Sequence, residues 1–470
     1  MRSLRAVAVL ITLMLFSAAC GQKEGVVNVA FRDGPGQESS ADTSAGEGDG
    51  QFADSGDTPV DQITDDGSAP DGSGSGGASS SGSNSGSGTS GTRSTSSGGG
   101  STSTGGGNSG SGSSTGSTAK GDSTGITDDE IVIGFHAPLT GAAPLPQTSF
   151  VKGQTQYWEY RGKVYGRNIK IIIKDDRYTP SHATSVCKGL IQQDKVFILG
   201  GAGGADQITA CARVAQAAGV PYVSPGVDEG ILRTLPNYFA FSKSYPQQAP
   251  LVIQWVAKNS PPSNKKFGII KDRTPSFQAV VDVMKAEAEK RGWEVLVRQA
   301  QNGPSDGQWL VQNQIEVAFP IMSPSTWVQI VNSPGGKIKQ WVGVGITMGL
   351  NTVSNAACPA IEGAMFLSPF PGYNVAKQLD PNTTAEDDIQ WALWGSNKLL
   401  DVIFTKMNGV LTRERFIEVQ ETQVIDNGIY PITRHTKNDH FTADSVHVLR
   451  ADCTARQFMT PPDGLFVKGF

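Results

Sequence analysis

The residues best suited to chemistry in this sequence are bare glycines and isolated polar side chains that follow short apolar runs. Gly201, Gly203 and Gly204 come after one such run. Their backbone N–H groups can bind an anionic group, helped by the dipole of the helix expected next. Asp228 follows another apolar run, and an ionised carboxylate there suits an ammonium group or the hydroxyls of a polyol or sugar.

Patterns that would indicate other chemistry are incomplete. Residues 121–125 (GDSTG) have the spacing of a hydrolase nucleophile turn, but low-complexity sequence precedes them where a strand is needed. The glycine turn lacks the last glycine of a dinucleotide motif, because Asp206 takes that position. His435, His440 and His447 have no metal-binding spacing with neighbouring acids. Without a nucleophile–base pair, we expect no enzyme, no cofactor and no metal site.

Alternating strands and helices must position these loops. We predict strands at 131–135, 169–174, 196–200, 221–224, 267–270, 293–298, 316–319, 341–344 and 446–449. We predict helices at 150–160, 181–193, 206–218, 251–258, 277–288 and 387–407. This alternation is typical of parallel sheets covered on both faces, so the predicted class is α/β with two doubly wound lobes. Ligands of such sheets bind beyond the carboxyl ends of the strands. The loops at those ends are 138–143, 201–206, 225–228, 272–277, 320–325 and 345–348.

The N-terminal quarter has the pattern of an export signal, followed by that of a flexible tether. Arg2 and Arg5 precede an apolar stretch at 6–16 and then small residues before Cys20, a pattern that resembles a bacterial lipobox. Residues 1–20 are therefore predicted as a lipoprotein signal peptide, with Cys20 lipidated. An ordinary secretion signal is the alternative. Residues 21–125 are dominated by Gly and Ser, and we predict a disordered tether.

The cysteines and the charge fit an exported protein that does not bind nucleic acid. Besides Cys20 the chain has Cys187, Cys211, Cys358 and Cys453, and four cysteines allow three pairings. We favour Cys187–Cys211 and Cys358–Cys453, because each pair falls within one half of the α/β alternation. The formal net charge of −5 offers no basic patch for nucleic acid or an anionic membrane surface.

Several stretches resemble the extracytoplasmic solute receptors of the branched-chain amino-acid (leucine/isoleucine/valine-binding) type. The matching stretches are 133–141 (IGFHAPLTG), 165–167 (YGR), 175–176 (DD), 198–201 (ILGG) and 219–225 (GVPYVSP). The resemblance implies a type I periplasmic-binding fold whose lobes are joined by three crossovers, near 244–245, 369–370 and 430–431. The first lobe would comprise 126–244 plus about 370–430, and the second 245–369 plus about 431–460.

The resemblance also implies which positions contact the ligand. In amino-acid-binding relatives, the first lobe holds the ligand carboxylate and an acid of the second lobe holds its ammonium. Here the hydroxyl position falls at Gly203 or Gly204, Asp228 stands where a Thr is common, and the acid position falls near Gly345, where no acid occurs. A small polar solute therefore fits better than a branched-chain amino acid.

The residues expected to contact this solute are Thr140, Gly201, Gly203, Gly204, Gly226, Asp228, Tyr245, Ser323, Trp327 and Thr347. Three of them keep a structural alternative. Asp228 could cap a helix, Tyr245 could pack in the hinge, and Trp327 could pack in the core.

The function that the resemblance implies is delivery of a small solute to an ATP-driven uptake system. Its partners would be ABC permease and ATPase subunits, and the lipid anchor would be its only membrane contact. We expect a monomer at the outer face of the cell membrane. A sensor or scavenger of the same fold, not coupled to transport, is the alternative.

Overall fold

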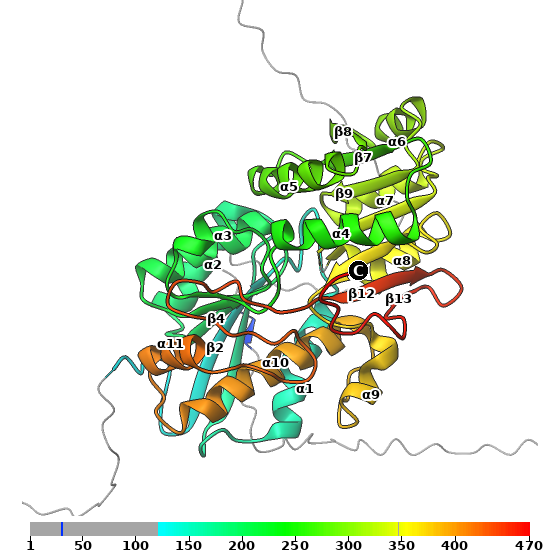
Figure 1. Cartoon of the computed structure of the whole chain (residues 1–470). Coiled ribbons are helices and arrows are strands. Elements are labelled where there is room, and N and C mark those ends of the chain that lie inside the picture. Colours follow the sequence, from blue (N-terminus) through cyan, green and yellow to red (C-terminus); the bar gives the residue numbers. More distant parts are fainter. Residues whose placement is uncertain (1–29, 32–120, 346) are drawn as a thin grey trace, which may run out of the picture. The chain divides into compact units, whose positions relative to one another are not determined.

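Apolar strands build two sheets, and these set the architecture. The computed structural model describes residues 30–31, 121–345 and 347–470 (Figure 1). The first sheet has the strand order β1-β3-β2-β4-β5-β6, and every neighbouring pair is parallel. Its strands are β1 (Ala30–Phe31), β2 (Glu130–Ala137), β3 (Asn168–Asp175), β4 (Ile198–Gly201), β5 (Tyr222–Ser224) and β6 (Tyr238–Ala240).

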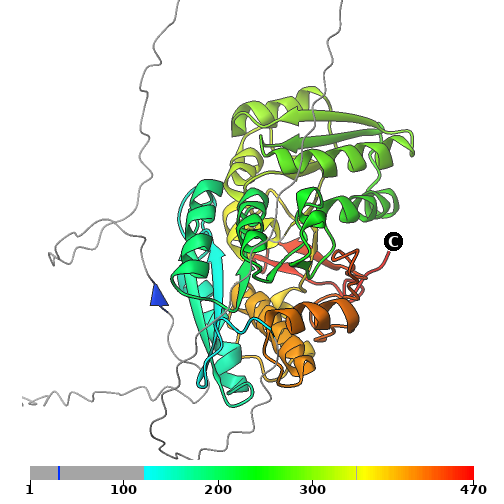
Figure 2. The same ribbon diagram turned by 90° about the vertical axis from the view of Figure 1, so that its left-hand side faces the viewer.

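Both faces of the first sheet are buried, which is why its strands are continuous apolar runs. Val132 packs in one apolar cluster with Leu190, whereas its neighbours Ile131 and Ile133 pack in another with Trp158. The helices of this lobe are α1 (Gln147–Arg161), α2 (Pro180–Gln192), α3 (Ala205–Ala217), α10 (Asp388–Met407) and α11 (Arg413–Thr422). Helix α2 packs on α3, and α1 packs on α10 although the two are far apart in sequence (Figure 2).

The second sheet has seven strands in the order β13-β12-β11-β10-β9-β7-β8. Its strands are β7 (Lys266–Lys271), β8 (Glu294–Gln299), β9 (Val317–Ile321), β10 (Gln340–Val344), β11 (Met365–Ser368), β12 (His447–Asp452) and β13 (Gln457–Met459). Strands β7 to β11 are parallel, while β12 runs antiparallel to β11 and β13 antiparallel to β12. The helices of this lobe are α4 (Tyr245–Asn259), α5 (Gln278–Glu289), α6 (Gly303–Gln312), α7 (Pro324–Asn332) and α8 (Asn351–Ala357).

The chain passes between the two lobes three times, after β6, after β11 and after α11. Each crossover contributes one aromatic ring to a shared cluster. The ring of Tyr430 lies 5.0 Å from that of Phe241 and 6.5 Å from that of Phe370, centroid to centroid. The predicted α/β class, with two doubly wound lobes joined by three crossovers, is confirmed.

Helix α4 begins six residues earlier than predicted, at Tyr245 instead of 251. Ser244 forms a capping box, because its side chain accepts from the Gln247 N–H and the Gln247 side chain accepts from the Ser244 N–H. Pro246 lies in the first turn, where a missing N–H costs nothing. The helix also continues through Pro250. The helix therefore accommodates both prolines.

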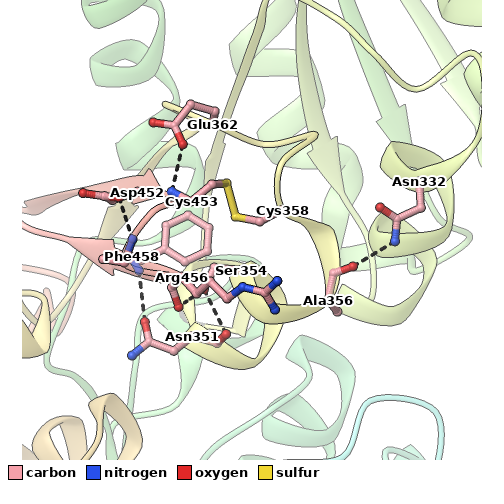
Figure 3. Close-up of a disulfide and its surroundings, with 11 residues drawn as sticks. Asn332, Asn351, Ser354, Ala356, Cys358, Glu362, Asp452, Cys453, Arg456 and Phe458 are labelled. Carbon is pink, nitrogen blue, oxygen red and sulfur yellow. Dashed lines mark hydrogen bonds between the residues drawn. A yellow bond between two sulfur atoms is a disulfide. The ribbon is translucent and has the colours of Figure 1, made fainter.

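Two disulfides join neighbouring elements in the pairing that the sequence favoured. Cys187 and Cys211 link α2 to α3, with Cα atoms 5.7 Å apart. Cys358 and Cys453 link the end of α8 to the turn after β12, with Cα atoms 5.4 Å apart (Figure 3). The backbone N–H of Cys453 also donates to the Glu362 carboxylate at 2.8 Å. Each bridge therefore lies within one lobe.

Residues 121–125, which the sequence analysis assigned to the tether, contact the first lobe. The guanidinium of Arg413 donates to the Asp122 carboxylate at 2.6 Å and to the backbone carbonyls of Val196 and Phe197. The Ser123 hydroxyl donates to the Leu411 carbonyl, so it is engaged structurally. Residues 121–125 are thus held against the first lobe at the start of α11.

Most of the elements that sequence patterns missed are short or rich in glycine and proline. They include β6, β11, β13, α6, α7, α8 and α11. The remaining short helices are η1 (Ile231–Thr234), η2 (Pro275–Phe277), η3 (Thr347–Gly349), η4 (Tyr373–Val375) and α9 (Ala376–Leu379). Within the described residues, no helix has both the length and the apolar character needed to cross a membrane. Cys20 and most of the predicted tether lie outside the described residues.

Candidate functional site

The glycine turn after β4 is shaped by its surroundings. Gly203 has φ +96°, and a Cβ there would also collide with the ring of Pro138, so only glycine fits. Gly204 is the N-cap residue of α3, with no side chain to cap the helix. The first N–H groups of α3 therefore keep the N-terminal partial positive charge that suits an anionic group.

Gly201 lets two buried side chains pack closely against the backbone. A Cβ on Gly201 would overlap the hydroxyl of Tyr222 and approach Nε2 of His136. These side chains belong to a buried hydrogen-bonded chain, in which His136 bonds Asp176 at 2.7 Å through Nδ1 and Tyr222 at 2.6 Å through Nε2. His136 and Asp176 are fully buried. The backbone at Gly201 thus closely approaches this chain, and a solute contact at Gly201 stays a prediction.

The carboxylate of Asp228 accepts a hydrogen bond within its own turn. Its Oδ1 accepts the N–H of Glu229 at 2.8 Å, and the side chain is almost entirely buried. Burial raises the pKa of Asp228 above its ordinary value, and the charges of Glu229 and Asp206 add to this. The following helix η1 has Gly230 as its N-cap without a side-chain cap bond, so the predicted helix cap is replaced by a turn.

Gly226 is unavailable as a backbone donor. Its N–H donates to the Ser242 hydroxyl at 2.9 Å, and a Cβ there would overlap the Ser242 carbonyl oxygen. A solute contact at Gly226 therefore stays a prediction that cannot rest on its N–H group. Its lack of a side chain lets the loop after β5 approach the first crossover.

Tyr245 reaches from the first crossover to the end of β10. Its ring packs against Phe277 at 6.4 Å between centroids. Its hydroxyl lies 3.1 Å from the position of a Cβ on Gly345, a residue with φ +107°. Burial raises the pKa of Tyr245 well above its ordinary value. These contacts lie on the loops after β7 and β10, and a solute contact of Tyr245 stays a prediction beside hinge packing.

The candidates in the second lobe are Ser323, Trp327 and Thr347. The Ser323 side chain caps α7 by accepting the Thr326 N–H. Trp327 is fully buried with its ring edge-to-face against Trp341, so the predicted solute contact is wrong and core packing is correct. The side chain of Thr347, at the start of η3, lies outside the described residues.

Thr140 is exposed on the loop after β2. Its hydroxyl donates to the Asp175 carboxylate, which also accepts the Thr140 N–H at 3.2 Å. Although burial alone would raise it, these and neighbouring hydrogen bonds lower the pKa of Asp175 below its ordinary value. Thr140 therefore anchors its loop to the end of β3.

Among the hydrogen bonds that connect the lobes, which include Asn351 to Asp388, two join loops at the carboxyl ends of the strands. The Ser276 hydroxyl, in η2 after β7, donates to Oδ1 of Asp206 in α3 at 2.7 Å. The Ser325 hydroxyl, in α7 after β9, donates to the Ala142 carbonyl at 2.8 Å. The loops of all four residues were predicted, but the individual partners were missed. Pairs so distant in sequence leave no local pattern.

Acidic side chains gather around the Ser276–Asp206 contact. Burial raises the pKa of Asp272, and the charge of Asp206 adds to this. Burial and the negative charges of Asp272 and Asp206 likewise raise the pKa of Tyr178. This environment favours a partner that donates hydrogen bonds, such as an ammonium or hydroxyl group.

One group of potential metal ligands occurs among the described residues, formed by His136, Cys187 and Cys211. Both cysteines are joined in a disulfide, and both nitrogens of His136 are hydrogen-bonded. The group does not suit a metal ion.

Comparison with known proteins gives consistent matches. Residues 130–452 match the family described as periplasmic binding protein. A curated "amino acid binding protein" of Pseudomonas aeruginosa is 27% identical over 188 residues, which are 39% of this chain and 50% of that protein. The chain thus spans about half the length of the curated relative that it matches.

Solved structures share the fold at low sequence identity. A leucine-binding protein from Thermotoga maritima matches with a TM-score of 0.60 and 15% identity, covering 71% of this chain and all of that one. A fatty acid ABC transporter substrate-binding protein from Thermomonospora curvata matches with a TM-score of 0.61 and 18% identity, covering 74% of this chain and 98% of that one.

Proposed function

The chain belongs to the periplasmic binding protein family, and from this membership we propose that it is the substrate-binding component of an ATP-driven uptake system. It binds a small solute between its lobes outside the cytoplasm and delivers it to a permease driven by ATPase subunits. The role is binding and not catalysis.

The observation that carries this proposal is the pair of hydrogen bonds between the lobes, Ser276 to Asp206 and Ser325 to Ala142. Both bonds lie at the carboxyl ends of the strands, where ligands of doubly wound sheets bind. Contacts of this kind exist only when the lobes meet. A solute that binds both lobes would add its own contacts to theirs and favour the closed arrangement.

The proposed solute is small and has a polar head that donates hydrogen bonds. Its amine or hydroxyl group binds near Asp228 and Asp272, and any anionic group binds the N–H groups at the start of α3. The relatives are named for amino acids, leucine and a fatty acid, so the family accommodates different solutes on one scaffold. An amino acid or a related compound fits the groups of this chain.

The decisive binding experiment is a thermal-shift screen of the mature full-length protein against amino acids, short amides, polyols and sugars. A solute that binds the folded state raises the melting temperature as its concentration rises. Asp228→Ala should lose most of this shift, while Asp463→Ala, which removes an exposed acid, should keep it. If no solute in the screen changes the melting temperature, the proposal of solute binding fails.

Transport and anchoring need separate measurements in cells. Deletion of the gene should abolish uptake of the labelled solute, and a sensor or scavenger would instead leave uptake unchanged. Cys20→Ser should release the protein from the membrane fraction, because acyl chains contribute about 0.8 kcal/mol per buried CH₂ to membrane binding. Continued membrane association of that variant would contradict the lipid anchor.

A further inference from the structure

An apolar cavity of about 80 Å³ lies inside the first lobe, apart from the acidic side chains described above. One wall is the sheet, where Ile133, Leu199 and Val223 line it from β2, β4 and β5. The opposite wall is α10, with Ile389 and Leu400. The cavity therefore lies between the main layers of the first lobe, and Leu350 of the second lobe also lines it.

The cavity offers an occupant almost nothing polar. Three polar side chains line it, those of Gln154, Ser396 and Tyr430. Each already bonds to the protein. The Gln154 carbonyl oxygen accepts from Asn397, the Ser396 hydroxyl donates to the Leu393 carbonyl, and the Tyr430 hydroxyl donates to the Ala392 carbonyl. A space lined in this way suits hydrocarbon better than water, which needs two to four polar partners.

The cavity also adjoins the loops expected to hold the solute. Gly201 and Ala202, after β4, and Pro225, after β5, belong to its lining. A group bound in it would therefore lie next to the turn that leads into α3. A molecule with a polar end at that turn could extend an apolar end into the lobe.

All three crossovers line the cavity as well. Phe241, Phe370 and Tyr430 each face it, and each lies on a different connection between the lobes. An occupant would contact the three segments whose backbone must change when the lobes move. Filling the cavity would therefore bias the position of the lobes as well as add affinity.

We propose that this cavity receives the hydrocarbon group of the transported solute, which makes the solute amphipathic, with a small polar head and an aliphatic or aromatic group of a few carbons. This inference rests on the proposed function and narrows it to a class of solute. The loops that carry Asp206, Asp228 and Asp272 select the polar head of the solute. The cavity selects the length and shape of its hydrocarbon group.

The test is a titration of the mature full-length protein with two homologous series, straight-chain carboxylates from acetate to decanoate and amino acids from glycine to 2-aminooctanoate. Isothermal titration calorimetry gives the affinity for each member. Within the series that binds, affinity should rise by about fourfold per methylene until the cavity is full, because burial of a CH₂ contributes about 0.8 kcal/mol.

Ala392→Leu, on α10, fills the cavity from one wall. It should weaken binding of the longest members at least tenfold, leave the shortest unchanged and keep or raise the melting temperature of the free protein. Ser396→Leu fills the same space from a half-buried position and covers the case in which Ala392→Leu misfolds. Ala286→Leu, the same change at an exposed site of α5, is the matched control and should change nothing.

Each outcome decides the inference. A chain-length dependence that both filling variants remove supports it. If affinity rises with length but both variants leave that rise intact, the tail binds elsewhere, and the inference fails while the proposed function stands. If no member of either series binds, the inference fails, and the proposed function fails with it only if the wider solute screen is also negative.

Discussion

The hydroxyl of Ser276 donates a 2.7 Å hydrogen bond to Oδ1 of Asp206, which joins the loop after β7 in one lobe to the first turn of α3 in the other. Together with Ser325, which donates to the Ala142 carbonyl, it ties the carboxyl ends of the two sheets together. Neither bond contributes to the core of either lobe. Their free energy therefore bears on how readily the lobes close.

Ser276→Ala should weaken solute binding while leaving the free energy of unfolding of each lobe nearly unchanged. A hydrogen bond contributes about 0.5–1.5 kcal/mol, so the dissociation constant should rise by roughly two- to twelvefold. Calorimetric titration and urea unfolding measure the two effects. Ser263→Ala is the matched control, because Ser263 donates to Glu316 within the second lobe. An equal loss of affinity in both variants would contradict a closure role.

Asp388 should make the stability of the protein depend on pH. Its carboxylate, at the start of α10, accepts the Asn351 N–H at 2.6 Å. Burial raises the pKa of Asp388 to about 6, from 3.8 in the unfolded chain. The folded state therefore binds the proton more tightly, and stability from the protonated form is lost as pH rises from about 4 through about 6.

Asp388→Asn keeps an acceptor for Asn351 without the charge. The variant should be more stable than the wild type at pH 7.5, by up to about 3 kcal/mol, and equal to it near pH 4. Chemical unfolding of both proteins across this range measures the difference. A difference that is constant with pH would show that Asp388 titrates normally.

The two disulfides should differ in their resistance to reduction. Cys187 and Cys211 are fully buried, whereas Cys358 and Cys453 are half-buried. A mild thiol should therefore cleave Cys358–Cys453 first, since exchange requires access to a sulfur. That bridge closes a separation of 95 residues, so its loss should lower the unfolding free energy by up to about 4–5 kcal/mol. Differential alkylation with mass spectrometry identifies the order, and the reverse order would refute the prediction.

Trp327→Ala should destabilise the second lobe without a specific effect on solute affinity. The indole is fully buried, and its ring lies 5.8 Å from that of Trp341 and 5.1 Å from that of Phe366. Truncating a buried Trp costs about 3–5 kcal/mol. Trp327→Phe retains most of the packing and should lose far less. Loss of solute affinity in Trp327→Phe at unchanged stability would instead support a contact between Trp327 and the solute.

The sequence predicted the strands and the lobes because burial on both faces demands continuous apolar runs, such as that of β9 from Val317 to Ile321. It missed β6, which has only three residues, and α6, whose first turn contains Gly303 and Pro304. Local composition carries little signal for elements so short or so rich in helix-breaking residues. Packing against neighbours decides them instead.

The site was harder to predict than the fold. The positive φ of Gly203 and the S-x-x-Q spacing of the Ser244 capping box leave a local trace in the sequence. The Ser276–Asp206 contact leaves none, because seventy residues and a lobe boundary separate its partners. Trp327 could not be assigned to the core until the position of Trp341 was known. Sequence patterns therefore located the loops, and tertiary structure decided which of their side chains meet.

The guanidinium of Arg413 fixes residue 122 to the edge of the first lobe and bonds two carbonyls of that lobe at the same time. In an anchored protein, a pull on the chain before residue 121 would therefore act first on the first lobe. The second lobe is attached to it through the three crossovers and carries no such load. In an anchored protein the first lobe would act as the fixed frame, and the second lobe would swing toward it as solute arrives.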